Sequence, residues 1–312
     1  MWHKYLYLVS VLHCQNLIIS LRRLHQHMKN SQKLKHILIT GCSSGIGLDA
    51  AKTLHNRGHR VVASVRDAAD LAQFAAIGID AVLLDLDDDT AITKGLNDAL
   101  QKLNGRLDVL FNNAAFGQPG AVEDLNRQIL QAQFNTNVFG TQQLTNQVIK
   151  IMRRQGEGRI VYNSSVLGLV ALPYRGAYNA SKFALEGLAD TLRLELHGSG
   201  ISVSLIEPGP IISQFRANAF AKYQQHIDKE TSAHRQVYQA MENRLTKTGP
   251  AAPFTLPASA VTDKLIHAIE AKQPKIRYFV TFPTYLLASL KRILPGRLLD
   301  WLLRKISTSE QR

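Results

Sequence analysis

Cysteine is nearly absent from this chain. Only Cys14 and Cys42 occur in 312 residues, too few for a disulfide framework. No grouping of histidine or cysteine has the spacing of metal ligands, and no internal repeat is apparent. We therefore expect a protein without a metal centre or a repeat architecture, located in the cytoplasm.

Long apolar runs are also missing. Residues 1–27 contain two short ones, Leu6 to Leu12 and Leu17 to Leu21, but His13 to Asn16 interrupt them, so a membrane-spanning helix is not predicted. The same segment lacks a small-residue cleavage site typical of a signal peptide. We interpret residues 1–34 as an N-terminal extension. Met28 stands a normal short distance before the first expected strand, and translation beginning there is our hypothesis.

The net charge of +13 is distributed unevenly. Residues 272–312 contain nine Lys or Arg against Asp300 and Glu310, which leaves about +3 for the middle of the chain after the N-terminal segment is counted. No stripe of basic and aromatic residues accompanies this charge, so we do not expect a nucleic-acid partner.

A basic amphipathic extension is predicted over residues 283–312. Leucine and isoleucine recur at helical spacing on both sides of the break at Pro295-Gly296, with Lys291, Arg292 and Arg304 among the interspersed cations. Two interpretations stay open. The extension docks as a helix pair on its own subunit or a partner, or it lies on an anionic membrane surface.

Strand-like apolar runs alternate with helical lengths between these two ends. This alternation predicts a single Rossmann-type, doubly wound α/β domain over residues 35–282, with a seven-stranded parallel sheet. In such a fold, ligands bind at the carboxyl ends of the strands. The expected strands are residues 36–40, 60–65, 81–86, 107–113, 158–164, 201–207 and 276–281.

A glycine-rich turn follows the first expected strand. Glycines at positions 41, 45 and 47 let the backbone turn tightly and approach a pyrophosphate. The helix that begins here presents unpaired N–H groups and the positive end of its dipole. Together these features predict a dinucleotide-binding turn.

Tyr178 and Lys182 stand one helical turn apart. A free tyrosine has a pKa of roughly 10 and is a poor base near neutrality. A neighbouring ammonium group favours the phenolate, so we expect Lys182 to lower the pKa of Tyr178.

These motifs occur together with Asn112-Asn113-Ala114-Ala115, Asn137, Ser165 and Pro208-Gly209, in that order. From about Lys35 to Thr281, the chain resembles the classical short-chain dehydrogenase/reductase family. Two departures from its pattern are visible: the usual Asn-Asn-Ala-Gly string ends in Ala115, and Cys42-Ser43 fill the variable part of the glycine turn. Neither removes a catalytic group, and Ala115 is tolerated unless its φ is positive.

The resemblance implies a catalytic tetrad. Ser165, which stands 13 residues before Tyr178, is selected over Ser164, and Asn137 is selected over Asn135. Ser165 and Tyr178 would bind the substrate carbonyl oxygen, and Tyr178 would give its proton as hydride arrives from the nicotinamide. Lys182 would also hold the nicotinamide ribose, while Asn137 would order a water against the lysine. The tetrad is therefore Asn137, Ser165, Tyr178 and Lys182.

The expected cofactor is NADP(H). The second strand ends at Val65, where an NAD-preferring relative would carry an acid, and Arg66 follows, able to pair with a 2′-phosphate. Asp67 comes one residue too late for the ribose role. Ser44 adds a hydroxyl for the same phosphate, and Asp85-Leu86 match the adenine position. The implied cofactor contacts are Gly41, Ser43, Ser44, Gly45, Ile46, Gly47, Arg66, Asp85, Leu86, Asn113, Ala114, Tyr178, Lys182, Pro208, Gly209, Ile211 and Ser213.

The substrate is expected to be apolar. No cluster of Arg or Lys marks an acidic substrate, and Gln214 to Pro257 form a long, polar, irregular segment that the resemblance identifies as a substrate lid. Ser165 and Tyr178 would hold the reacting group. Leu172 and Phe116 are the expected apolar contacts, with Phe215 and Phe220 as further wall candidates.

The function implied is NADP(H)-dependent, reversible reduction of an apolar aldehyde or ketone. Tyr178 to Lys182 and the residues after them look like the branch of 17β-hydroxysteroid and retinol dehydrogenases. Ile206 to Ile211 and Leu294 to Arg297 look still more like its bacterial NADP-dependent aldehyde reductases. The alternatives are a retinol or hydroxysteroid dehydrogenase acting at a membrane surface, or a non-catalytic NADP(H)-binding sensor. A homo-oligomer, dimer or tetramer, is implied as well.

Overall fold

The computed structural model describes residues 34–250 and 252–310, with side chains described to residue 307. The chain divides into two units, Met1–Leu34 and Lys35–Arg312, of which the second is the folded domain considered below. Our hypotheses on residues 1–27 and on a start at Met28 fall outside the described residues.

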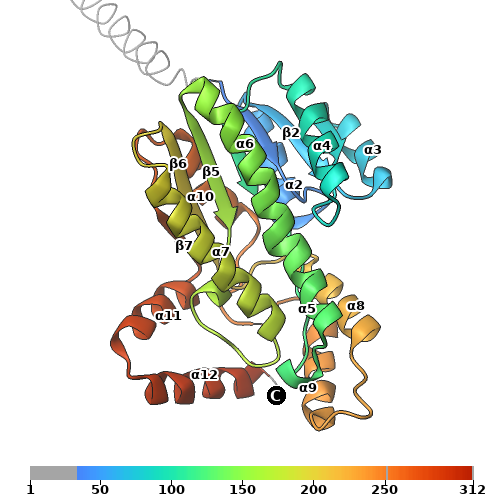
Figure 1. Cartoon of the computed structure of the whole chain (residues 1–312). Coiled ribbons are helices and arrows are strands. Elements are labelled where there is room, and N and C mark those ends of the chain that lie inside the picture. The colour runs from blue at the N-terminus through green and yellow to red at the C-terminus, as the bar shows by residue number, and fades with distance from the viewer. Residues whose placement is uncertain (1–33, 251, 311–312) are drawn as a thin grey trace, which may run out of the picture. The chain divides into compact units, whose positions relative to one another are not determined.

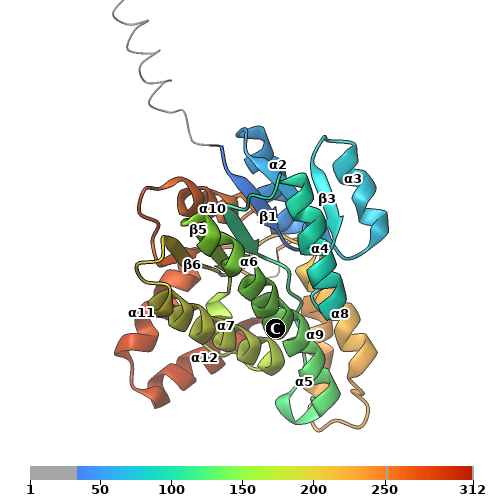
Figure 2. The same cartoon turned by 45° about the horizontal axis from the view of Figure 1, so that its top comes forward.

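Seven parallel strands form one sheet, in the order β3-β2-β1-β4-β5-β6-β7 (Figures 1 and 2). The order reverses at β1, which pairs with both β2 and β4. The predicted single doubly wound domain with a seven-stranded sheet is confirmed. The strands are β1 (His36–Ile39), β2 (Arg60–Val65), β3 (Asp80–Leu83), β4 (Val109–Asn112), β5 (Gly158–Asn163), β6 (Ile201–Pro208) and β7 (Arg277–Val280).

Helices cover both faces of the sheet, so the strands are mostly apolar. Successive strand residues point to opposite faces: Leu38 packs in one core cluster, while Ile37 and Ile39 pack in the other. In Figure 1, α6 and α7 cross in front of the sheet. The first core lies under α4 (Asp89–Lys102), α6 (Thr141–Gln155) and α7 (Gly176–Glu195), and the second under α2 (Gly45–Asn56), α3 (Leu71–Ala75) and α10 (Ser259–Glu270).

The lid segment is ordered, which corrects the prediction that Gln214 to Pro257 are irregular. It forms α8 (Phe215–His226) and α9 (Arg235–Thr246), which pack on each other. The prediction failed because α8 buries only Ala219 and Tyr223, too few apolar positions to show helical periodicity. The lid has its own small core, made of Ala121, Tyr223, Tyr238, Met241 and Leu245.

The C-terminal extension forms α11 (Phe282–Ile293) and α12 (Gly296–Glu310). Leu287 of α11 and Leu303 of α12 pack against Leu167, Val170 and Leu172, in the segment between Ser165 and Tyr178. The structure therefore supports the first of the two interpretations, in which the extension docks on its own subunit. Both helices lie at the lower left of Figure 1.

Candidate active site

The glycine turn forms a cradle that side chains would fill. Gly41 and Gly45 have positive φ values of 68° and 56°. A Cβ atom on Gly47 would lie 2.2 Å from the Gly41 carbonyl oxygen, so only glycine fits there. Ser44 is the N-cap of α2, yet its side chain makes no cap hydrogen bond. Free N–H groups at the start of α2 and the close backbone approach suit a pyrophosphate.

Asn113 joins the carboxyl ends of three strands. Its Nδ2 donates to the carbonyl oxygens of Thr40, at 2.9 Å, and Gly41, at 3.0 Å. Its Oδ1 accepts a hydrogen bond from Asn163. Thr40 Oγ1 in turn accepts from the backbone N–H groups of Asn113 and Ala114. Thr40 and Asn163 are site residues that we did not predict, although each adjoins a motif in the sequence.

Ala114 and Ala115 line the same edge. A Cβ on Gly41 would lie 2.7 Å from the Ala114 Cα, so Ala114 packs directly against the glycine turn. Ala115 has no positive φ, and its methyl group therefore introduces no backbone strain.

The end of β2 carries no acid. Val65 is buried, Arg66 is exposed, and Asp67 accepts a hydrogen bond from the Ala69 N–H as the N-cap of the following turn. Beyond β3, Asp85 Oδ1 accepts from the Asp87 N–H at 3.0 Å. Leu86 is buried in the core, so a cofactor could reach this residue only through its backbone.

The segment after β6 lies beside the glycine turn. The Gly209 N–H donates to the Val280 carbonyl, and Ile211 pairs with Leu256 at the end of the lid. A Cβ on Gly45 would come within 3.0 Å of the Ser213 Cβ. The structure thus brings Ile46, partly buried on α2, and the segment from Pro208 to Ser213 to one edge of the sheet, as expected for a shared dinucleotide site.

Ser165, Tyr178 and Lys182 lie together. Lys182 is buried, and its Nζ donates to the Asn163 carbonyl oxygen at 2.7 Å and lies 5.6 Å from the centre of the Tyr178 ring. Ser165 Oγ donates a long hydrogen bond, 3.5 Å, to the Pro208 carbonyl oxygen and lies near the Tyr178 hydroxyl, whose pKa it lowers. Ser164 instead lies beside Gly168.

Burial controls the titration of this pair. Burial raises the pKa of Tyr178 to about 12, and the Ser165 hydrogen bond opposes this only in part. Burial also lowers the pKa of Lys182 to about 8, while the Glu186 carboxylate raises it. Our expectation that Lys182 lowers the pKa of Tyr178 is therefore not met in this arrangement. At neutral pH, Tyr178 is a protonated phenol, which can donate a proton to a carbonyl oxygen.

Asn137 is fully buried in a π-helical turn, Asn135–Gly140, between α5 (Arg127–Phe134) and α6. Its Oδ1 accepts from the Phe116 N–H at 3.1 Å, and its Nδ2 donates to the Phe116 carbonyl oxygen and to Ser181 Oγ. Asn135 is exposed. Asn137 therefore fixes the backbone of Phe116 and contacts the residue next to Lys182.

The lid segment touches Tyr178. Phe215, the first residue of α8, packs edge-on against Tyr178, with ring centres 5.2 Å apart. A Cβ on Gly117 would lie 2.8 Å from Phe215, so glycine leaves room for this ring. Lys222 of α8 lies 5.6 Å from the centre of the Phe116 ring. Phe116 and Phe215 thus border the space next to Tyr178.

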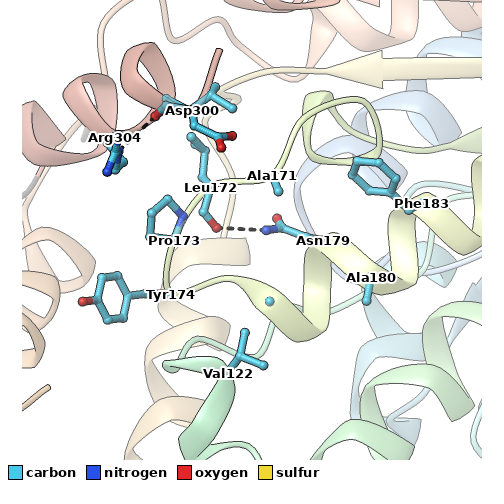
Figure 3. Close-up of a pocket in the computed structure, with 12 residues that line it drawn as sticks. Val122, Ala171, Leu172, Pro173, Tyr174, Asn179, Ala180, Phe183, Asp300 and Arg304 are labelled. Carbon is cyan, nitrogen blue, oxygen red and sulfur yellow. Dashed lines mark hydrogen bonds between the residues drawn. The ribbon is translucent and has the colours of Figure 1, made fainter. Parts of the chain in front are cut away.

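A separate cavity of about 640 Å³ lies along another face of α7 (Figure 3). Leu172 lines it, and the Leu172 carbonyl accepts a hydrogen bond from Asn179 at 2.9 Å. None of the tetrad lines this cavity, whose α7 residues are Gly176, Asn179, Ala180 and Phe183. Leu172 is also in the apolar cluster against which Tyr178 packs.

A dinucleotide cradle at the switch point of a doubly wound sheet, next to a protonated tyrosine, a serine and a buried lysine, defines a nicotinamide-dependent oxidoreductase. The family model of short chain dehydrogenases matches residues 35–224. The chain belongs to this family, whose members act on hydroxyl or carbonyl groups with NAD(P) and typically form oligomers. In residues 34–250 and 252–310, no three His, Cys, Asp or Glu side chains gather in a way that could hold a metal ion.

Individual relatives agree with this assignment. "Uncharacterized oxidoreductase YbbO" of Escherichia coli (strain K12) is 43% identical over 270 residues, covering 86% of this chain and 94% of the relative. Human "Retinol dehydrogenase 8" is 37% identical over 194 residues, covering 60% of this chain and 62% of the relative. A crystal structure of a short-chain dehydrogenase from Streptomyces avermitilis has a TM-score of 0.70 and 26% identity, covering 89% and 97% of the two chains.

Proposed function

We propose that this protein reduces an apolar aldehyde or ketone to the alcohol with NADPH, reversibly. The observation that carries the proposal is the protonated Tyr178 hydroxyl, near Ser165 and Lys182, at the edge of the dinucleotide cradle. When bound, the reduced nicotinamide supplies the hydride to the carbonyl carbon.

Residues of the chain bind the carbonyl oxygen of the substrate and supply the proton that it receives. Ser165 and Tyr178 both donate hydrogen bonds to the carbonyl oxygen, which orients the substrate. The O–H bond of Tyr178 then breaks, and its proton goes to that oxygen as negative charge develops there. The Lys182 ammonium stabilises the resulting phenolate until a proton returns. In the oxidation direction, Tyr178 takes the alcohol proton back.

NADP(H) is favoured over NAD(H) by the residues near the end of β2. Arg66 is exposed just beyond the end of β2, and Asp67 is engaged as a cap. The Ser44 hydroxyl makes no cap hydrogen bond and is available to the same phosphate. A guanidinium pairs with a phosphate through charge-assisted hydrogen bonds.

An apolar substrate is supported by the aromatic surroundings of Tyr178. Phe215 contacts the Tyr178 ring, and Phe116 is held beside the site by Asn137. Neither residue offers a charged group to a substrate. Medium-chain aldehydes, retinal and 17-ketosteroids are the substrate classes that this proposal covers.

The direct test is NADPH consumption, followed by its ultraviolet absorbance, against a panel of medium-chain aldehydes, retinal and a 17-ketosteroid. We expect turnover with at least one class and slower turnover when NADH replaces NADPH. Tight NADPH binding without turnover on any of them would contradict the reductase proposal and support the sensor alternative.

A membrane-surface form of the activity is supported by the outward face of α11 and α12. Both helices bury one side against the same apolar cluster, yet their opposite sides are also apolar. From Phe282 to Ile306, five cations accompany one acid, Asp300. Apolar side chains flanked by cations, with tryptophan among them, suit an anionic lipid surface. The exposed apolar residues are Phe282, Tyr285, Leu286, Ile293, Leu298 and Trp301.

Vesicle sedimentation tests this surface. We expect the full-length protein to sediment with vesicles containing phosphatidylserine and not with neutral phosphatidylcholine vesicles. Ile293→Glu combined with Trp301→Glu should reduce sedimentation at least about tenfold, because each acid removes apolar contact and repels the lipid charge. Ile77→Glu is the control, since Ile77 is also an exposed aliphatic residue but lies just beyond α3. Equal sedimentation of all three proteins would refute membrane binding through α11 and α12.

Among the described helices, none is long and apolar enough to span a bilayer.

A homo-oligomer built through the helices that flank the active site is part of the proposal. Phe183, Leu188 and Leu194 are exposed on α7, and Phe139 is exposed just before α6. A second copy of the chain would cover these apolar side chains.

A further inference from the structure

Behind the tetrad lies a group of charged side chains centred on Arg277 of β7. Arg277 Nη1 contacts Glu186 and also Glu207, the latter at 2.5 Å, while Nη2 contacts Asp190 at 2.6 Å. Glu207 has no accessible surface, and Glu186 is 7% exposed. Burying such charges costs desolvation free energy, so stability alone does not explain their presence.

The group joins two parts of the active site. Glu186 stands one helical turn beyond Lys182 on α7, on the same side of the helix. Glu207 immediately precedes Pro208, whose carbonyl oxygen accepts the long hydrogen bond from Ser165. Arg277 therefore connects the helix that carries Tyr178 and Lys182 to the end of the strand that faces Ser165.

We propose that Glu186, Arg277 and Glu207 form a positioning network, which aligns Lys182 with Ser165 and keeps the lysine ammonium charged. The proposal rests on the proposed reductase function, because that function gives the charge of Lys182 its role. None of the three residues touches the reacting atoms.

The unpaired oxygens of the network support this role. Within the described part of the chain, Glu186 Oε1 and Glu207 Oε2 are buried and have no hydrogen-bond partner. A salt bridge selected only for stability would satisfy these oxygens. The Glu186 carboxylate leaves negative charge near Lys182 and raises the pKa of that lysine against the effect of burial.

The charge of Glu207, and with it the charge of the network, depends on pH. Burial, together with the Glu186 carboxylate, raises the pKa of Glu207 to about 8, and the pKa of Lys182 is also about 8. The two groups therefore titrate in the same range. As pH rises, Glu207 loses its proton and competes more strongly for Arg277, the cation that it shares with Glu186, and the network becomes more negative.

The other charged groups around the network are few. On α7, Asp190 pairs with Arg193 at 2.7 Å as well as with Arg277. On α11, Lys291 interacts electrostatically with Glu186. Tyr178, which lies beside Lys182, stays protonated through this range because its pKa is about 12.

The test measures the charge of Lys182 directly. The full-length protein is labelled with ¹³C-lysine, the ε-CH₂ signal of Lys182 is assigned with Lys182→Arg, and its titration is followed by NMR. We expect Glu186→Gln and Glu207→Gln each to lower the titration midpoint by about one pH unit, a tenfold loss of proton affinity. These variants keep side-chain volume, whereas Arg277→Met would leave buried carboxylates without a cation and destabilise the fold.

Glu270→Gln is the matched control, because Glu270 also pairs with an arginine, Arg57 at 2.7 Å, but on α10, across the sheet from α7. It should leave the Lys182 midpoint unchanged. An unchanged midpoint in the Glu186 and Glu207 variants would overturn the network.

The alkaline limb of the kcat–pH profile provides the second readout, and it should move by the same amount and in the same direction as the Lys182 midpoint. If the unmodified protein oxidises no NADPH with any substrate, the proposed function fails, while the NMR titration still decides the network. If it is active but the Lys182 midpoint does not move in the variants, the network alone fails.

Discussion

Replacing Tyr178 with phenylalanine should lower kcat by about 10³-fold or more. The change removes one oxygen atom, and with it the proton donor and one of two hydrogen bonds to the carbonyl oxygen. NADPH affinity, measured by fluorescence titration, should change by less than about threefold, because Phe keeps the ring that packs against Phe215. A large loss of kcat with little change in NADPH affinity would show that the Tyr178 hydroxyl has a chemical role and not a structural one.

Tyr162→Phe is the control for this change. Tyr162 is buried, and its hydroxyl donates to Gln142 Oε1 at 3.1 Å, within the core between β5 and α6. Its loss should cost about 1 kcal/mol of stability and leave kcat nearly unchanged. Residual activity of Tyr178→Phe within about tenfold of the parent would assign proton donation to another group.

Replacing Arg66 with aspartate should reverse the cofactor preference. The change removes the cation that pairs with a 2′-phosphate and installs an acceptor for the ribose 2′-OH. We expect kcat/KM for NADPH to fall about 10²-fold while that for NADH rises, as measured in parallel assays with one substrate. Because the side chain is exposed, stability should change little.

Arg60→Asp makes the same charge change at the opposite end of β2. It should leave the ratio of the two kcat/KM values within about twofold of the parent, since the two positions are about 20 Å apart along the strand. If the Arg66→Asp enzyme still prefers NADPH, the 2′-phosphate is recognised by Ser44 or by another group and not by Arg66.

The sheet could be predicted because its signals are local. The expected strand at residues 60–65 agrees with Arg60–Val65, and the one at 107–113 contains Val109–Asn112. Buried parallel strands require continuous apolar runs, and the glycine turn requires glycine at 41, 45 and 47. Both requirements concern residues that lie close together in the sequence. The lid helices were missed because most of α8 is exposed, so burial leaves little pattern in its sequence.

The packing of the C-terminal helices could not be predicted from local sequence either. Their amphipathic character was predicted, but two docking targets stayed open, since Leu287 and Leu303 carry no information on what they contact. Packing against Leu172 decides the question, and those contacts span more than one hundred residues of chain.

By itself, the sequence determined the doubly wound fold, the family and the residues from which a tetrad and a dinucleotide cradle are built, because motif order and spacing reflect short-range geometry. Only the tertiary structure decided the environment of those residues. The Asn163 carbonyl at Lys182 and the contact of Glu186 with Arg277 depend on how distant elements pack. Burial then decided the protonation of Tyr178, since desolvation in the folded chain raises its pKa, which the local spacing of Tyr178 and Lys182 does not show.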